Sequence, residues 1–420
     1  MFLEKEGKLI YSYDGETVCI EAWGKDALRV RATKNRSFTG RDWALEAKDA
    51  HAGEVEIFED PSAKGGAFAN MYEGTDTSYG KITNGKLHAV IDSGSVITFY
   101  HEDGRVLLKE HFRRLRDEES MPLNIMGREY SNGVGDNFRI VARFVARKGE
   151  KIFGMGQYQQ HELDLKGCML ELAQRNSQVS VPFYLSSIGY GFLWNNPGVG
   201  QVMFANNGTE WVTESGKEID YLVIAGDTPA EIEENYMTLT GKPPMMPEYG
   251  MGFWQCKLRY WNQEQLLSVA RKYKELGVPL DVIVVDFFHW TKQGEFKFDP
   301  KYWPDVPGMC RELKEMGIQV VVSVWPTVDI YSENFEEMKE KGYLVRTEHG
   351  VPLTMLCGGN EVFFDATNPD ARTYVWEKIK KNYYDQGAKL FWLDVAEPEY
   401  SVYDFKNYRY QLGSVQEVGN

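Results

Sequence analysis

The chain has 420 residues, which is enough for two or three domains with a substantial core. Hydrophobic residues make up 43% and aromatic residues 14% of the sequence, as expected of a folded protein. The formal net charge of −15 argues against nucleic acid or an anionic membrane as a partner, because both repel a negative surface.

Targeting and redox signals indicate a cytoplasmic protein. The start, MFLEKEGKLIYSYDGE, lacks the apolar region of a signal peptide, and no apolar run reaches the roughly 18 residues that span a membrane. Five cysteines are scattered along the chain without a C-x-x-C pair, so neither a zinc site nor a disulfide framework is indicated.

Residues 1–228 are typical of an antiparallel β-sandwich. Short alternating stretches are separated by glycine, aspartate and asparagine turns, and such alternation predicts strands with one buried face. The spacing of the turns favours a sandwich over βαβ units. Examples of these stretches are 17–23, 27–33, 86–91 and 95–101.

Residues 229–248 predict a connection between two domains. The stretch 229-PAEIEENYMTLT-240 predicts a linking helix. The following stretch, 241-GKPPMMPEYG-250, has three prolines after a leading glycine, and these residues interrupt helices and strands.

Residues 249–420 alternate apolar strands with amphipathic helices, which predicts a parallel sheet covered on both faces. The predicted strands are 250–255, 280–286, 318–325, 361–365 and 389–394, and the predicted helices are 263–276, 308–317, 333–342 and 369–387.

This pattern leaves an open doubly wound sheet or a barrel. An open sheet that binds a nucleotide needs a glycine-rich turn after its first strand, and 254-WQCKLRYWN-262 has no glycine. Polar residues recur instead at strand ends, where barrels place their active sites. Only about half of the eight barrel strands fit in the region, so we expect the first half of a (β/α)₈ TIM barrel, a partial barrel.

Two carboxylates follow apolar strands, Asp286 after 282-VIVV-285 and Asp394 after 390-LFWL-393. Each could be a helix cap or an ion-pair partner. Together, with aromatic neighbours, they favour a pocket in which partly desolvated carboxylates face a developing cation. Cleavage of a glycosidic bond requires such an arrangement. Glu397 either orients its neighbours or transfers a proton.

Two readings from other functional classes remain. A sugar-binding protein without turnover would use the same rings and Asp286, and would not need an activated Asp394. A metal-dependent barrel enzyme would use Asp286, His289 and Glu397, but no second histidine or cysteine stands at ligand spacing. If the protein were such a metal-dependent enzyme, a chelator would abolish its activity.

The stretch 389-KLFWLDVAEPEY-400 resembles the nucleophile motif of glycoside hydrolase family 31, W-[ILM]-D-x-x-E-P. Further similar motifs follow the family's order, so the resemblance covers roughly residues 10–420. It implies a β-sandwich before a barrel, and a retaining exo-acting α-glycosidase without a cofactor, acting on an oligosaccharide or glycoside. The further motifs are 153-FGMGQ-157, 189-GYGFLWNNP-197, 281-DVIVVDFFHW-290 and 362-VFFDATNP-369.

The resemblance assigns roles to individual positions. Asp394 matches the nucleophile that forms the covalent glycosyl-enzyme, and Asp286 matches the acid that binds hydroxyls of the terminal sugar. Trp392 corresponds to a wall of the same subsite, with Arg259, Tyr260 and Glu397 nearby, and Phe287 and Phe288 are placed to supply bulk beside C5.

The substrate implied most directly is an α-xyloside. D-V-A-E-P-E-Y followed by 407-NYRYQLG-413 is most similar to members described as α-xylosidases. A xylosyl pocket excludes the C6 hydroxymethyl group of glucose. The α-glucosidase alternative stays open, because a single hydroxymethyl group separates the two sugars.

The chain departs from the family at one point. The family's general acid/base is an aspartate on a later barrel strand, and the chain stops at Asn420 before it. Asp404 and Glu417 remain, but neither follows an apolar strand. We therefore expect a fragment that is inactive alone, whose open sheet edges favour aggregation or a homo-oligomer.

Overall fold

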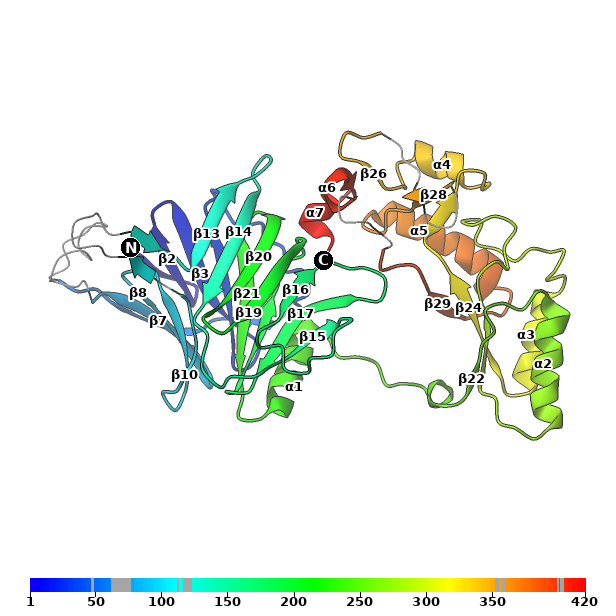
Figure 1. Ribbon diagram of the computed structural model, residues 1–420, viewed down its shortest axis with the longest axis horizontal. Helices are drawn as coiled ribbons and strands as arrows, with labels where there is room; N and C mark the ends of the chain where they lie inside the picture. Colours follow the sequence, from blue (N-terminus) through cyan, green and yellow to red (C-terminus); the bar gives the residue numbers. More distant parts are fainter. Residues whose placement is uncertain are drawn as a thin grey trace. The chain divides into compact units, whose positions relative to one another are not determined.

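A computed structural model describes residues 1–46, 49–61, 77–111, 113–115, 123–351, 355–356, 360–398, 400 and 404–420 (Figure 1). Within these residues the chain forms two compact units, Met1–Pro243 with Gln416–Asn420, and Pro244–Val415. None of the helices in the described ranges has both the length and the apolar character that a membrane crossing requires.

The first unit is built from antiparallel sheets. The largest sheet has nine strands in the order β1 (Phe2–Lys5), β2 (Lys8–Tyr13), β3 (Glu16–Trp23), β4 (Ala27–Thr33), β21 (Ile219–Ala225), β18 (Tyr190–Trp194), β17 (Val179–Ser186) and β15 (Ile152–Gln157), with β5 (Ala50–His51) beside β3. A second sheet has the order β13 (Arg128–Asn132), β14 (Phe138–Phe144), β20 (Gly208–Gly216), β19 (Gly200–Ala205) and β16 (Met169–Leu172). A third has the order β10 (Val106–Lys109), β9 (Ile97–His101), β8 (Leu87–Asp92), β7 (Tyr79–Asn84) and β6 (Glu54–Phe58), and β11 (Arg113–Leu115) pairs with β12 (Leu123–Ile125).

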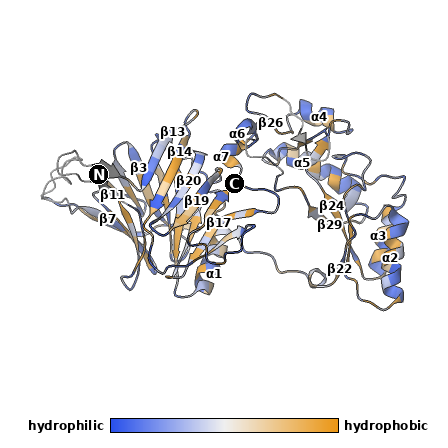
Figure 2. Cartoon of the chain, viewed as in Figure 1, coloured by the Kyte–Doolittle hydropathy of each residue, from blue (hydrophilic) through white to orange (hydrophobic). Residues whose placement is uncertain are grey.

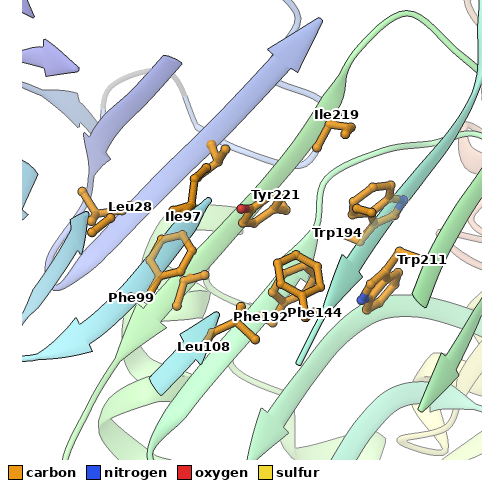
Figure 3. Packing of buried hydrophobic residues seen from close by; sticks show 14 of the residues in the cluster. Leu28, Ile97, Phe99, Leu108, Phe144, Phe192, Trp194, Trp211, Ile219 and Tyr221 are labelled. Atoms are coloured by element: carbon orange, nitrogen blue, oxygen red, sulfur yellow. The ribbon is translucent and has the colours of Figure 1, made fainter. Parts of the chain in front are cut away.

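Aromatic side chains join the largest sheet to the other two, as Figure 3 shows. Phe192 on β18 contacts Phe144 on β14 and Trp211 on β20, with ring centroids 5.3 and 5.2 Å apart. Phe99 on β9 meets Tyr221 on β21 at 6.2 Å. Since one continuous core lies between facing sheets, the predicted antiparallel sandwich is confirmed.

The predicted helix forms, but it belongs to the first unit, where Ile232 and Leu239 are buried in the core. α1 spans Pro229–Thr240, with Thr228 as its N-cap and Pro229 at the first helical position. The division at Pro243 falls inside the proline-rich segment. The last residues return to the first unit, because Val199 N donates to Gln416 O and Asn420 N donates to Pro197 O, both at 2.9 Å.

The second unit contains a four-stranded parallel sheet among its described residues. The strand order is β22 (Trp254–Gln255), β23 (Val282–Val285), β24 (Gln319–Val324) and β29 (Leu390–Leu393). One face packs against α2 (Gln263–Glu275) and α3 (Val306–Glu315) through a shared core. Figure 2 shows mixed colours on both helices, as amphipathic helices require.

Shorter elements complete this unit. They are the 3₁₀ turn Glu248–Met251, α4 (Phe335–Glu340), β25 (Thr327–Asp329), β26 (Arg346–Thr347), β27 (Met355–Leu356), β28 (Asn360–Phe363), α5 (Pro369–Ile379) with a π-helical extension Lys380–Tyr384, α6 (Asp404–Asn407) and β30 (Tyr408–Arg409). The last helix, α7 (Val415–Val418), belongs to the first unit from Gln416 onward.

One predicted strand pairs differently from expectation. Residues 361–365 were expected in the parallel sheet, but β28 pairs antiparallel with β25 and β27 in a separate sheet. The physical reason is that β24 already pairs with β29, so that edge of β24 is occupied. A local apolar pattern predicts a strand but does not select its partner.

Candidate functional site

The four parallel strands present two different faces. Ile283 and Val285 belong to the core under the helices, whereas Val282 and Val284 cluster with Val321 on the opposite face. Because side chains alternate along a strand, the residue that follows β23 continues the face of Val282 and Val284. Asp286 is that residue.

The same alternation brings four side chains to the carboxyl end of this face. Each is the first residue after its strand: Cys256 after β22, Asp286 after β23, Trp325 after β24 and Asp394 after β29. The carboxyl ends of parallel strands form the functional rim of a barrel. The two predicted carboxylates therefore lie at one rim, separated by the strand that carries Trp325.

Asp394 is fixed by a hydrogen bond from the neighbouring strand. Trp325 Nε1 donates to Asp394 Oδ2 at 3.1 Å, and Asp394 N donates to Val324 O at 3.1 Å. The described residues give Oδ1 no hydrogen-bond partner. One carboxylate oxygen is thus oriented by the protein, while the other keeps its lone pairs for a ligand.

Asp286 is held by two donors close to it. Phe287 N donates to Oδ1 at 2.8 Å, and the Cys256 thiol donates to Oδ2 at 3.4 Å. Burial, followed by the charge of Asp286, raises the pKa of Cys256 to about 11, so this thiol stays protonated at neutral pH.

Aromatic rings connect the two carboxylates. Phe287, next to Asp286, stacks on Trp325 with centroids 5.2 Å apart, and Trp325 in turn bonds Asp394. Phe288 and Trp290 also contact the Trp325 ring, at 6.4 and 5.8 Å. The rim therefore combines two carboxylates with a continuous aromatic wall.

Two rim residues have unusual backbone conformations. Phe288 has φ 61° and Val395, which follows Asp394, has φ 59°. A left-handed conformation is unfavourable for a bulky or β-branched residue, and such strain concentrates at functional sites. Both strained residues lie within two positions of a predicted site carboxylate.

His289 lies beneath the rim and is 2% exposed. Its Nδ1 lies 3.0 Å from Asp286 O, and its Nε2 lies 2.9 Å from the Tyr383 hydroxyl. Both ring nitrogens have protein partners, so neither is free for the metal set of Asp286, His289 and Glu397. Among the described residues, no group of three or more potential ligands is placed to hold a metal ion.

The remaining predicted site residues occupy different environments. Trp392 is on the same face as Asp394 and half exposed. The Arg259 guanidinium lies over the rings of Trp261 and Phe288, at 3.9 and 5.2 Å, and so joins the loops after β22 and β23. Tyr260 is buried in the core under the helices, and burial raises its pKa.

Glu397 and the two other acids considered, Asp404 and Glu417, occupy three different environments. Glu397 is half buried, and its Oε2 has no hydrogen-bond partner within the described part of the chain. Asp404 begins α6 and is buried, whereas Glu417 lies in the first unit and accepts from Asn137 Nδ2 at 3.1 Å. Among the described residues, no strand of the parallel sheet ends directly before Asp404 or Glu417.

Sequence reasoning missed two polar residues of this face. Cys256 counted only as a scattered cysteine, although its place one residue after the first strand could have indicated the rim. Ser323, paired in register with Trp392, is 2% exposed, and its hydroxyl has no partner among the described residues. Its place one residue before the end of an apolar strand was the available signal.

Comparison with known families matches both units. Residues 243–417 match the model described as "Glycosyl hydrolases family 31 TIM-barrel domain". Residues 17–202 match the "Glycosyl hydrolase 31 N-terminal galactose mutarotase-like domain".

Individual relatives are similar over nearly the whole chain. The family 31 glucosidase ORF2 of Pseudescherichia vulneris, itself named as uncharacterized, is 45% identical over 100% of this chain and 78% of its own length. Alpha-xylosidase A of Aspergillus niger is 31% identical over 91% of this chain and 52% of its own length. A crystal structure of a family 31 α-xylosidase from a soil metagenome, complexed with xylose, is 50% identical with a TM-score of 0.91. This chain spans 61% of that structure's chain.

Proposed function

The chain belongs to glycosyl hydrolase family 31, and from this premise we propose that it carries the nucleophile and sugar-binding half of a retaining, exo-acting α-glycosidase site. In the proposed reaction Asp394 attacks the anomeric carbon of a terminal sugar, and Asp286 binds that sugar's hydroxyl groups. The preferred substrate class is an α-xyloside, and no cofactor takes part.

One observation carries the proposal. Asp286 and Asp394 lie at the carboxyl ends of strands in one parallel sheet, on one face, and Phe287 and Trp325 connect them. Among the described residues no cation pairs with Asp394. Its side chain accepts from a neutral indole, so a carboxylate without a cationic partner faces the place where an oxocarbenium ion would develop.

The proposed chemistry proceeds in two displacements. An oxygen of Asp394 forms a bond to C1 of the sugar while the bond from C1 to the leaving oxygen breaks, and an acid supplies a proton to that oxygen. Water then attacks C1, gives up a proton to the same residue and releases Asp394. The Trp325 hydrogen bond fixes Oδ2, which leaves Oδ1 to act as the nucleophile.

The rings beside Asp286 support the preference for xylose. Phe287 and Phe288 contact each other with centroids 4.5 Å apart, and Phe287 stacks on Trp325, so bulk surrounds this end of the subsite. The solved relative in complex with xylose agrees with this preference. α-Glucosidase activity is the second candidate, favoured by the name of the relative that is 45% identical over the whole chain.

The acid/base is proposed to lie outside this chain, on the rest of a larger barrel. The support is structural, since both edge strands of the sheet expose apolar side chains: Trp254 on β22, and Trp392 and Leu393 on β29. The chain alone is then expected to show little or no hydrolysis of aryl α-xylosides or α-glucosides. Turnover at rates typical of an intact enzyme would contradict this part of the proposal.

The free thiols Cys19, Cys168, Cys256 and Cys310 suit a cytoplasmic location.

A mechanism-based reagent tests the nucleophile without needing the acid. A 5-fluoro-α-xylosyl fluoride has fluoride as its leaving group, which departs without protonation. Mass spectrometry should find one adduct on the peptide that contains Asp394, and Asp394→Asn should abolish it. The glucosyl reagent should react more slowly. An adduct on another carboxylate would refute the assignment of Asp394, and faster labelling by the glucosyl reagent would favour the α-glucosidase.

A further inference from the structure

The first unit contains a cavity of about 430 Å³ that the proposed reaction does not use. The loop after β4 and the turn between β20 and β21 contribute to its lining, which includes Phe38, Trp43, Arg36 and Arg41. The volume lies within the range of small-molecule binding sites. All residues that line the cavity belong to the first unit.

A buried ion pair holds the loop beside this cavity. Arg29 is fully buried and donates to both carboxylate oxygens of Asp220, from Nε at 2.9 Å and from a terminal nitrogen at 2.6 Å. Its guanidinium also donates to Asp42 Oδ1 at 2.7 Å and to Arg41 O at 2.9 Å. These four hydrogen bonds from one rigid guanidinium plane anchor the loop to β4 and β21.

Asn195 fixes the same loop from a second direction. Its Nδ2 donates to Asp42 O at 3.1 Å and to Asp220 Oδ2 at 2.8 Å, and its Oδ1 accepts from Ala44 N at 3.3 Å. A buried ion pair of this kind contributes little net stability after desolvation. Its structural effect is to determine the positions of residues 41–44.

Trp43 lies on the anchored loop, and its side chain lines the cavity. Its backbone has φ 52°, which is unfavourable for a bulky aromatic residue and persists only where surrounding contacts impose it. The Arg41 guanidinium lies 5.0 Å from the centre of its ring. The network therefore stabilises a strained conformation that places an aromatic ring in the wall of the cavity.

Cationic and anionic side chains line the cavity in nearly equal numbers, Arg36, Arg41 and Lys217 against Asp136, Glu218, Asp220 and Glu417. Lys217 pairs with Asp136 at 3.0 Å, Asp220 pairs with Arg29, and both oxygens of Glu218 accept from Thr39, at 2.8 and 2.9 Å. Within the described residues Arg36 and Arg41 form no ion pair. This set offers two aromatic rings and the guanidinium donors, without a large excess of either charge.

From these observations we propose that the cavity beside Trp43 is a second, non-catalytic binding site for a neutral saccharide. The apolar face of a sugar ring packs on Trp43 or Phe38, and its hydroxyl groups accept from the guanidiniums of Arg36 and Arg41. A neutral ligand suits the nearly equal numbers of opposite charges, and a cavity of about 430 Å³ has room for a pyranose ring.

Isothermal titration of the full chain with maltotriose and with methyl α-D-xyloside tests the site. The background is Asp286→Ala, which removes the proposed barrel subsite. Saccharide binding should persist in this variant and should weaken at least tenfold when Trp43→Ala is added. Phe58→Ala, an exposed aromatic on β6 in the same unit, is the matched control and should have no effect.

Two further variants keep the test decisive if Trp43→Ala does not fold. Arg41→Gln removes a guanidinium while the Trp43 ring stays, and Asn195→Ala frees the loop while every side chain that lines the cavity is retained. Both should weaken binding several-fold. No binding in the Asp286→Ala background, or binding that is indifferent to all three variants, would overturn the proposal and would leave the proposed glycosidase site unaffected.

Discussion

His289 supports the strand end that carries Asp286. A carbonyl oxygen only accepts, so Nδ1–H donates to Asp286 O, and Nε2 of the neutral ring accepts from the Tyr383 hydroxyl. Burial lowers the pKa of His289 to about 4. The neutral imidazole is thus a structural support for the site.

This histidine predicts a pH dependence of stability. The pKa is about 4 in the folded state and near 6.5 when unfolded, so the unfolded chain binds the proton first as the pH falls. The second unit should lose up to about 3 kcal/mol between pH 6.5 and pH 4 from this group. Urea unfolding of His289→Gln should show a flatter pH dependence, whereas the exposed control His161→Gln should retain the wild-type slope. An unchanged slope in His289→Gln would contradict the assignment.

The labelling rate of the Cys256 thiol can measure its interaction with Asp286. Burial and then Asp286 raise the pKa of this thiol to about 11, and the thiolate is the form that reacts with iodoacetamide. Asp286→Asn removes the charge, so labelling of Cys256 at pH 8 should become several-fold faster. Cys168 in the first unit is the internal control and should react at an unchanged rate. Equal acceleration of both thiols would indicate general loosening of the fold.

At the scale of single elements, the start of α2 determines where the first rim loop ends. Asn262 Oδ1 accepts from Gln265 N at 2.9 Å, and Gln265 Oε1 accepts from Trp261 N at 2.7 Å. These reciprocal bonds satisfy backbone donors before the helix begins. They also fix Trp261, over which the Arg259 guanidinium lies.

Loss of this cap should destabilise the second unit. Asn262→Ala should lower the free energy of unfolding of the second unit by about 1 kcal/mol. Asn262→Asp should retain most of this stability, because aspartate also caps helices. The measurement is the urea midpoint of the second unit. A loss as large in Asn262→Asp as in Asn262→Ala would show that the effect is not capping.

The elements with strong local signals were predictable from sequence. α1 has the predicted bounds because Thr228 and Pro229 mark its start, and α2 ends at Glu275, one residue before the prediction. The partner of β28 was not predictable, because pairing depends on which strand edges are free in space. The Cys256–Asp286 bond was equally hidden, since it joins residues 30 positions apart.

In the molecule as a whole, β29 is an edge strand of the parallel sheet that exposes two neighbouring apolar side chains. Leu393 is 70% exposed, and Trp392, on the opposite face of the strand, is 48% exposed. Because side chains alternate along a strand, Leu393 lies on the same face of the sheet as Phe391. This is the face that packs against the helices at the other strands. An uncovered apolar edge of this kind favours association with another chain.

We therefore predict that the chain forms homo-oligomers or larger aggregates, in competition with its net charge of −15. Salt screens the repulsion between like-charged chains, so light scattering should show more association at 0.5 M than at 0.05 M salt, roughly Debye lengths of 4 and 14 Å. Leu393→Lys places a charge on the edge and should shift the chain toward monomer at both salt concentrations. Leu163→Lys, at an 80% exposed leucine of the first unit, adds the same charge away from the edge and should change association much less. Equal effects of the two substitutions would mean that net charge, and not the edge of β29, controls association. A chain that stays monomeric and unfolds reversibly at all protein concentrations would contradict the interpretation that β29 is an open edge.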